Sequence, residues 1–308
     1  MLKDIFISPQ VFTEPTINQD SWKDIKHLLE NILNSGYVIG LKRKRWIKET
    51  NSNISKLEPK IKDHLMALIK ILKDRERIVD HPTAEIDFGN ESDWLKLALK
   101  LHEKRCLHSI FSTHTQESML SPECLEDMNI SVEYGISGSQ TFLLSSENIK
   151  KILTPFLSYA KKLTIIDPYF YIHKKESQES LRIIAKMLSE RRGEKQPGSI
   201  VVNCRFTDRD RDEAFPIPKW QSIIENISKD SGQTIEINCW EQQSYSIRMH
   251  DRYLITNQSG LVSAAGTNVH DFQQSEWSIK DHRELQEILA QYKPNSSPFK
   301  LIHRLSTE

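Results

Sequence analysis

Apolar runs of strand length alternate with amphipathic runs of helix length over residues 141–240 of this chain. The strand-like runs cover residues 141–144, 163–166, 199–206 and 234–240, and the helix-like runs cover 146–160, 177–192 and 220–228. The first of these helices begins with a Ser/Glu start signal and has its apolar residues at helical spacing. Because strands that alternate with helices build a parallel sheet covered by helices, this order predicts an α/β domain.

Polar residues suited to binding phosphate surround the two short strands that follow. These strands are expected at 253–256 and 261–265, with an Asn-Gln-Ser-Gly turn between them. His250 and Arg252 lie at the start of the first strand, and Asn268 follows the second within a Gly-x-Asn sequence. Since such side chains gather at strand ends, we interpret them as a phosphate site. The structural alternative for His250 is a hydrogen-bonded histidine without a ligand.

The spacing resembles one half of the phospholipase D superfamily signature, His-x-Lys-x4-Asp followed by Gly-Ser-x-Asn. The resemblance covers residues 136–308 and implies a mixed sheet with flanking helices. It also implies that His250 attacks phosphorus to form a phosphohistidine, while Arg252 and Asn268 hold the phosphoryl oxygens. Arg252 stands where the family has Lys, and Asn257 where it has Asp. Arginine binds phosphate bidentately but places its charge differently from lysine. With Arg252 in place of lysine, we therefore expect phosphate binding to be retained more readily than catalysis.

An Ile-Ile-Asp-Pro-Tyr strand end and a later His-Asp-Arg triplet are also similar to the C-terminal domain of MIT-domain proteins. That family has the phospholipase D fold without its catalysis, and its members bind membranes or partner proteins. Here the triplet is His250, Asp251 and Arg252. Asn268 agrees with the phospholipase D signature and so favours the enzyme. Arg252 and Asn257 depart from that signature and so favour a binding module.

Two further charged residues stand at the carboxyl ends of predicted strands, where the ligands of open α/β sheets gather. Asp167 is expected to orient His250 by accepting its second ring N–H. Arg205 ends the next strand and is expected to bind the substrate. The alternatives are a simple Asp-Pro turn for Asp167, and a solvated charged loop for Arg205 and the arginines that follow it.

The chain contains one such motif. Family members with a single motif build their site from two copies, so that one histidine attacks and the other protonates the leaving group. The resemblance therefore implies a homodimer with twofold symmetry.

A basic segment near the N-terminus is the candidate contact with nucleic acid. Lys and Arg total 42 and Asp and Glu total 42, so binding to nucleic acid or anionic lipid needs a local patch. Five consecutive residues can pair with phosphates and stack on a base: Lys42, Arg43, Lys44, Arg45 and Trp46. The alternative is an exposed basic loop, or a basic turn that leads into a helix in which Trp46 is packed.

Residues 1–125 form a separate, smaller α/β domain in this interpretation, and residues 113–136 are the candidate linker. Strands are expected at 5–7 and 107–111, and helices at 22–33, 61–72 and 93–101. The first strand and the later helix and strand resemble those of PIN-like nucleases. Ser8 replaces the first metal-binding Asp of that family, and His114 to Gln116 stand where another Asp is expected. Without clustered carboxylates a divalent ion lacks ligands, so we expect a scaffold or recognition domain.

Cysteine and histidine usage bears on location and cofactors. Four widely spaced cysteines without a Cys-x-x-Cys pair indicate reduced thiols and a cytoplasmic protein. The eleven histidines show no metal-ligand spacing, so neither a metal nor another cofactor is expected. We also expect no transmembrane segment and no secretory signal, because no apolar run approaches membrane-spanning length.

The sequence thus predicts a prokaryotic two-domain protein whose leading function is metal-independent cleavage of phosphodiesters in nucleic acid. Such nucleases serve in antiviral defence, which implies a partner protein from the same defence system. The competing hypothesis is a catalytically inert module that binds nucleic acid, a lipid headgroup or an acidic partner protein. Dimerisation that brings two His250 side chains together would favour the nuclease, and a monomer would favour the module.

Overall fold

The computed structural model describes residues 3–13, 17, 21–41, 43–80, 93–104, 107, 109–112, 139–190, 197–206, 217–243, 247–270 and 272–307. The chain divides into two compact units, Met1–Ile136 and Ser137–Glu308. The linker predicted at 113–136 lies outside the described residues. No helix within the described ranges is long and apolar enough to cross a membrane.

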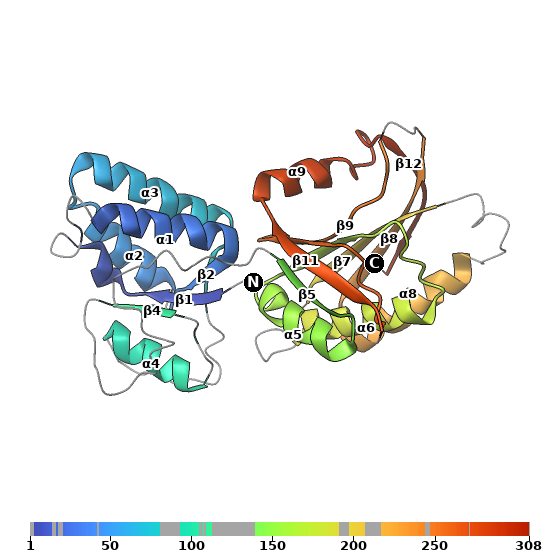
Figure 1. Cartoon of the computed structure of the whole chain (residues 1–308), viewed down its shortest axis with the longest axis horizontal. Coiled ribbons are helices and arrows are strands. Elements are labelled where there is room, and N and C mark those ends of the chain that lie inside the picture. The colour runs from blue at the N-terminus through green and yellow to red at the C-terminus, as the bar shows by residue number, and fades with distance from the viewer. Residues whose placement is uncertain are drawn as a thin grey trace. The chain divides into compact units, whose positions relative to one another are not determined.

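The N-terminal unit is built on a four-stranded parallel sheet with the order β3-β2-β1-β4. Its strands are β1 (Lys3–Ile7), β2 (Gly36–Ile39), β3 (Ile78–Val79) and β4 (Ser109–Phe111). Its helices are η1 (Pro9–Phe12), α1 (Ser21–Ser35), α2 (Arg43–Ile54), α3 (Pro59–Asp74) and α4 (Trp94–Lys104). Figure 1 shows α1 and α3 on one face of this sheet and α4 on the other. The predicted strands and helices are present. The short strands β2 and β3 and the helix η1 are additional, and α2 is the helix that the alternative for the basic segment implied.

Each helix of this unit buries one stripe of side chains. In α1 the stripe has the spacing of an amphipathic helix and consists of Ile25, Leu28, Leu29 and Ile32. In α2 the fully buried residues Trp46, Thr50 and Ile54 recur every fourth position. Because a threonine interrupts the apolar stripe, this helix is harder to recognise in the sequence than α1.

The C-terminal unit is built on an eight-stranded mixed sheet with the order β12-β8-β7-β6-β9-β10-β11-β5. Its strands are β5 (Ser139–Leu143), β6 (Lys162–Ile166), β7 (Ser199–Arg205), β8 (Thr234–Gln242), β9 (Arg252–Thr256), β10 (Gly260–Ser263), β11 (Gln274–Lys280) and β12 (Phe299–Ser306). Strands β6, β7 and β8 are parallel, and the other pairs are antiparallel. The α/β class expected from the sequence is therefore present, with β11 and β12 in addition to the predicted strands.

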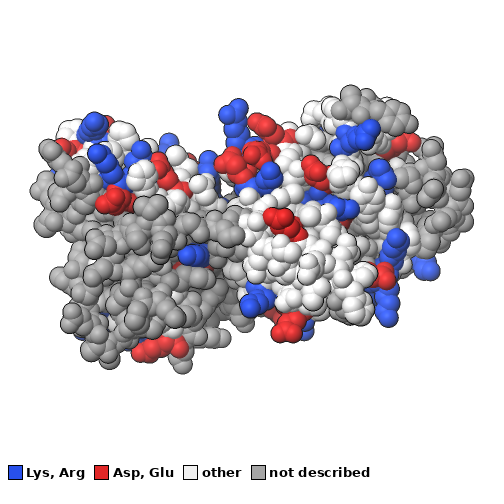
Figure 2. Space-filling model, viewed as in Figure 1, with Lys and Arg blue, Asp and Glu red and all other residues white. Residues whose placement is uncertain are grey.

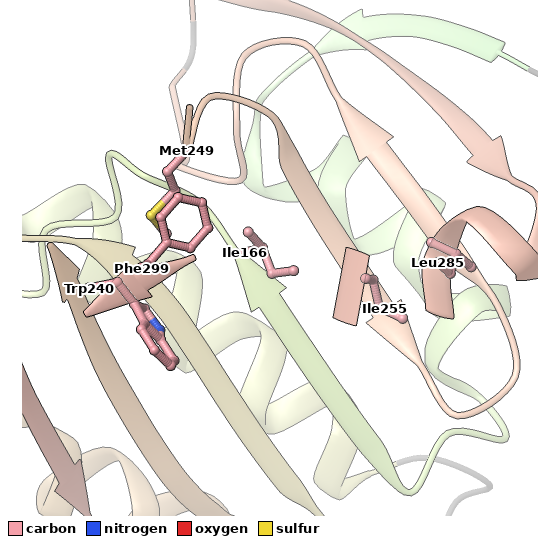
Figure 3. Packing of buried hydrophobic residues seen from close by; sticks show 6 residues of the cluster. All are labelled: Ile166, Trp240, Met249, Ile255, Leu285 and Phe299. Atoms are coloured by element: carbon pink, nitrogen blue, oxygen red, sulfur yellow. The ribbon is translucent and has the colours of Figure 1, made fainter. Parts of the chain in front are cut away.

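Helices cover both faces of the larger sheet. They are α5 (Ser146–Leu157), α6 (Lys175–Ser189), α8 (Ile217–Ser231) and α9 (His282–Ala290). Figure 1 shows α5, α6 and α8 on one face and α9 on the other. A buried cluster that includes α9 consists of Ile166, Trp240, Met249, Ile255, Leu285 and Phe299 (Figure 3). Leu285 of α9 packs where β10 has no side chain, because a Cβ added at Gly260 would lie 2.3 Å from Cδ2 of Leu285.

The alternation of side chains along β6 and β9 decides which residues face away from α9. Ile166 pairs with Tyr253 in an antiparallel register, and both side chains pack in the cluster with α9. Neighbouring residues of a strand point to opposite faces, so Asp167 and Arg252 point away from α9. Two charged residues that are distant in sequence thereby meet at the carboxyl end of β6.

Candidate functional site

Asp167 and Arg252 form the centre of the candidate site. The Nε atom of Arg252 lies 3.5 Å from Oδ1 of Asp167, and its Nη1 donates to the carbonyl of Ala264 at 2.6 Å. Asp167 is almost fully buried, whereas the Arg252 side chain is 22% exposed. The antiparallel register places Arg252, and not His250, beside Asp167. The predicted pairing of Asp167 with His250 is therefore corrected to a pairing with Arg252.

Burial dominates the electrostatics of Asp167. Desolvation raises the pKa of its carboxyl, while the amide of Tyr169, the charge of Arg252 and the amide of Thr267 act in the opposite direction. The Tyr169 amide donates to Oδ1 at 2.9 Å. Gly266 has a φ of 87°, and a Cβ added there would lie 2.7 Å from Oδ2 of Asp167. Both the backbone angle and this close approach therefore require glycine in the Gly-x-Asn sequence.

Tyr169 connects two arginines at the strand ends. Its ring centroid lies 4.9 Å from Cζ of Arg252 and 5.3 Å from Cζ of Arg205, within the range of cation–π attraction. Among the described residues Arg205 makes no ion pair, and its buried Nε has no hydrogen-bond partner. We call Asp167, Tyr169, Arg205 and Arg252 the strand-end cluster. Its two cations outnumber its single buried carboxylate.

His250 precedes Arg252 by two positions, and its polar neighbour is Asp251. Its side chain is 72% exposed, and Nδ1 is 3.4 Å from Oδ1 of Asp251. Oδ2 of Asp251 accepts the hydroxyl of Tyr253 at 3.1 Å. Burial, followed by the charge of Asp251, raises the pKa of Tyr253 to about 12. The carboxylate next to the imidazole is thus its neighbour in sequence.

Helix α6 holds Asn268. Oδ1 of Asn268 accepts a hydrogen bond from the hydroxyl of Ser177 at 3.1 Å. Oγ of Ser180 accepts a hydrogen bond from the amide of Val269 at 2.9 Å. Both serines are fully buried. No hydrogen bond or ion pair within the described part of the chain joins Asn268 or His250 to the strand-end cluster.

The structure therefore unites three predicted site residues, Asp167, Arg205 and Arg252, around the ring of Tyr169, which was not predicted as a site residue. Tyr169 follows the Asp-Pro pair at the end of a predicted strand, which is the only signal that marks it. That two arginines reach its ring depends on the register of β6 with β7 and β9, which cannot be read from one sequence.

The basic segment of the N-terminal unit opens helix α2. Lys44 is exposed, and Nε of Arg45 lies 2.6 Å from Oε1 of Glu49. Trp46 is fully buried, and its Nε1 donates to the carbonyl of Ile7 at 2.6 Å. Its ring therefore packs in the core and is not presented to a base, so the expected stacking role is wrong. The alternative is confirmed, in which the basic segment leads into a helix with Trp46 packed. Lys42 and the side chain of Arg43 lie outside the described residues.

The residues that would bear on metal chemistry are placed in part. Within the described ranges no three His, Cys, Asp or Glu side chains lie together as a metal site. Ser8 accepts the amide of Gln10 at 3.4 Å and caps η1. His114 to Gln116 lie outside the described residues. Cys204 and Cys239 are buried free thiols.

No family model matches the sequence, and no curated protein is similar to it. Among solved structures, the chain is similar to TrmBL2, an archaeal chromatin protein whose structure is described as showing a mode of DNA binding. The identity is 17%, the TM-score is 0.26, and the match spans 51% of this chain and 52% of that chain. A TM-score this low does not establish a shared fold.

Proposed function

We propose that the C-terminal unit is a phospholipase D-like module that recognises a phosphate-bearing ligand without cleaving it. The observation that carries this proposal is the strand-end cluster, in which Arg205 and Arg252 both contact the ring of Tyr169. The fold supports it as well, because the cluster lies at the carboxyl ends of parallel strands in a mixed sheet.

The two arginines have different roles in this proposal. Asp167 and the carbonyl of Ala264 hold Arg252 in one orientation, which reduces the side-chain entropy that phosphate binding would otherwise remove. Arg205 makes no ion pair among the described residues, so its charge is not offset there. Guanidinium groups bind phosphate through parallel hydrogen bonds to two oxygens, and a preset pair suits one phosphodiester group.

The position of His250 favours binding over cleavage. A nucleophile must be held close to phosphorus while cations hold the oxygens. The His250 side chain is instead mostly exposed, and among the described residues its polar contact is with Asp251, so no contact directs it toward a bound phosphate.

Binding to a phosphodiester oligomer that lacks bases tests this proposal. We expect Arg205→Gln and Arg252→Gln each to weaken the affinity about 10- to 150-fold, since each removes a charged hydrogen-bond donor. Arg283→Gln is the matched control, because its side chain on α9 is 89% exposed. Unchanged affinity in both cluster variants, with the proteins folded, would refute the proposal.

A second candidate is the metal-independent phosphodiesterase, and the contact between His250 and Asp251 supports it. A carboxylate that accepts Nδ1–H leaves Nε2 as the nucleophilic atom of a side chain that is 72% exposed. A second copy of the chain would have to supply the other histidine. Cleavage of labelled single-stranded DNA, duplex DNA or RNA in EDTA, abolished by His250→Ala, would decide for this candidate. In that case a role in antiviral defence would also become testable.

For the N-terminal unit we infer a PIN-like scaffold without metal-dependent cleavage. The parallel strand order supports the fold, and the capping role of Ser8 supports the loss of chemistry. Added Mg²⁺ or Mn²⁺ is expected to produce no nuclease activity, and metal-dependent cleavage by the purified protein would contradict this inference.

A further inference from the structure

Phe272 is the most exposed large apolar side chain in the described part of the chain, at 90% exposure. It lies between β10 and β11, in the segment that also carries Asn268. Leu143, at the end of the edge strand β5, is 41% exposed, and its ladder partner Gln274 lies two residues beyond Phe272. A fully exposed aromatic ring forgoes the free energy of burial, which a binding partner can recover.

Hydrogen bonds hold the backbone on both sides of this ring. The amide of His270 donates to the carbonyl of Leu144 at 2.9 Å, and the amide of Leu144 donates to the carbonyl of Gln273 at 2.9 Å. The amide of Phe272 donates to Nδ1 of His270 at 3.4 Å. The exposure of the ring therefore belongs to an anchored segment.

The segment that presents Phe272 begins at the strand-end cluster. Gly266 closely approaches Asp167 and Arg252, and the amide of Thr267 lowers the cost of ionising Asp167. Phe272 lies five positions after Thr267, which limits their Cα separation to about 18 Å. The ring and the arginines are thus within reach of one extended ligand.

We propose that Phe272 is a stacking platform for a nucleobase and that the ligand of the strand-end cluster is single-stranded nucleic acid. This inference rests on the proposed phosphate-binding function. Single strands expose the faces of their bases, and aromatic side chains bind those faces with little dependence on sequence. Nδ1 of His270 accepts the amide of Phe272, so the imidazole is in contact with the backbone of the proposed platform.

The small apolar area of this region favours a stacked base over a membrane. Stable membrane association needs a broad apolar face or a polybasic patch. Here one ring and one partly exposed leucine stand beside Glu276, which is also exposed. A single stacked base needs no larger apolar surface.

Fluorescence anisotropy on the full chain tests this inference with two labelled probes of equal length. One is an oligothymidylate, and the other has the same phosphates and sugars without bases. We expect the wild type to bind the oligothymidylate about 5- to 150-fold more tightly than the abasic probe. Phe272→Ala is expected to remove this difference and leave the abasic affinity unchanged, whereas Phe272→Trp keeps it.

The outcomes separate the two proposals. Undiminished discrimination in Phe272→Ala would overturn the stacking platform, and a loss of abasic binding in Arg205→Gln would show that phosphate recognition stands nevertheless. If neither Arg205→Gln nor Arg252→Gln weakens binding to the abasic probe, the proposed function itself is overturned.

Two other results would assign the ring to another partner. Binding to phosphatidylserine vesicles that requires Phe272, without discrimination between the probes, would assign the ring to a membrane. A dimer in light scattering that Phe272→Ala dissociates, again without discrimination, would assign it to a second copy.

Discussion

Asp167 links stability to pH. Its pKa in the folded chain is raised above the unfolded value, so its contribution to stability is fully present below the unfolded pKa. That contribution is lost as pH rises through the folded pKa. Asp167→Asn removes the titrating group. We therefore expect the free energy of unfolding of this variant to increase relative to that of the wild type as pH rises from about 4. The gain is about 1.4 kcal/mol for each unit between the two pKa values.

Urea denaturation at a series of pH values measures this difference. Asp251→Asn is the matched control, because Asp251 is 66% exposed and its removal leaves the strand-end cluster intact. A stability gap between Asp167→Asn and the wild type that stays constant across the series would contradict the interpretation that burial dominates this carboxyl.

Gly266 provides a second test at single-residue scale. Gly266→Ala combines a positive φ with a Cβ placed 2.7 Å from Oδ2 of Asp167. Gly232 also has a positive φ, but no atom lies within 4 Å of an added Cβ. We expect Gly232→Ala to cost about 1–2 kcal/mol of stability through backbone strain alone. Gly266→Ala should cost more and also weaken binding to the abasic probe, and equal effects in both assays would refute the close approach.

The residues of the candidate site could be predicted in part. Asp167, Arg205 and Arg252 are identifiable because charged side chains at strand ends follow from the strand pattern. Their partners are not, since the register of β9 against β6 decides that Arg252 meets Asp167. Phe272 is not identifiable either, because exposure of one aromatic residue in a polar segment depends on tertiary packing.

Helix α9 packs on the face of the larger sheet opposite to the side chains of Asp167 and Arg252. Leu285 is almost fully buried against Gly260 and the neighbouring cluster, while Leu289 on the same helix is only partly buried. We expect Leu285→Ala to lower the free energy of unfolding by about 2–5 kcal/mol, as a buried Leu-to-Ala change does. Leu289→Ala should cost less, and thermal or urea denaturation of both variants would show it. A larger loss for Leu289→Ala would mean that α9 packs through another face.

Many elements follow the sequence pattern, whereas β11, β12 and α9 were not predicted. The predicted helices coincide with α1, α3, α4, α5, α6 and α8, because each has a continuous apolar stripe. Strands β2 and β3 are too short to show a period. The buried stripe of α2 is hard to recognise in the sequence because it contains Thr50 and begins within a run of cations. That run of cations suggests a nucleic-acid contact when the sequence is read alone.

Positive and negative charges balance over the whole chain. Lys and Arg number 42 against 42 Asp and Glu. Figure 2 shows cationic and anionic side chains interspersed over the visible described surface. Long-range attraction of a polyanion therefore contributes little, and affinity has to come from a few local contacts.

The salt dependence of the affinity measures how many phosphate contacts the chain makes. Each phosphate contact on a single strand contributes about −0.7 to the slope of log affinity against log salt concentration. With Arg205 and Arg252 as the contacts, we expect a slope of about −1.4 for the oligothymidylate, falling to about −0.7 in Arg252→Gln. Phe272→Ala should lower the affinity without changing the slope, because stacking releases no counterions. A wild-type slope much steeper than this would mean that a wider basic surface, such as the start of α2, contacts the strand, and the two-arginine account of the site would be wrong.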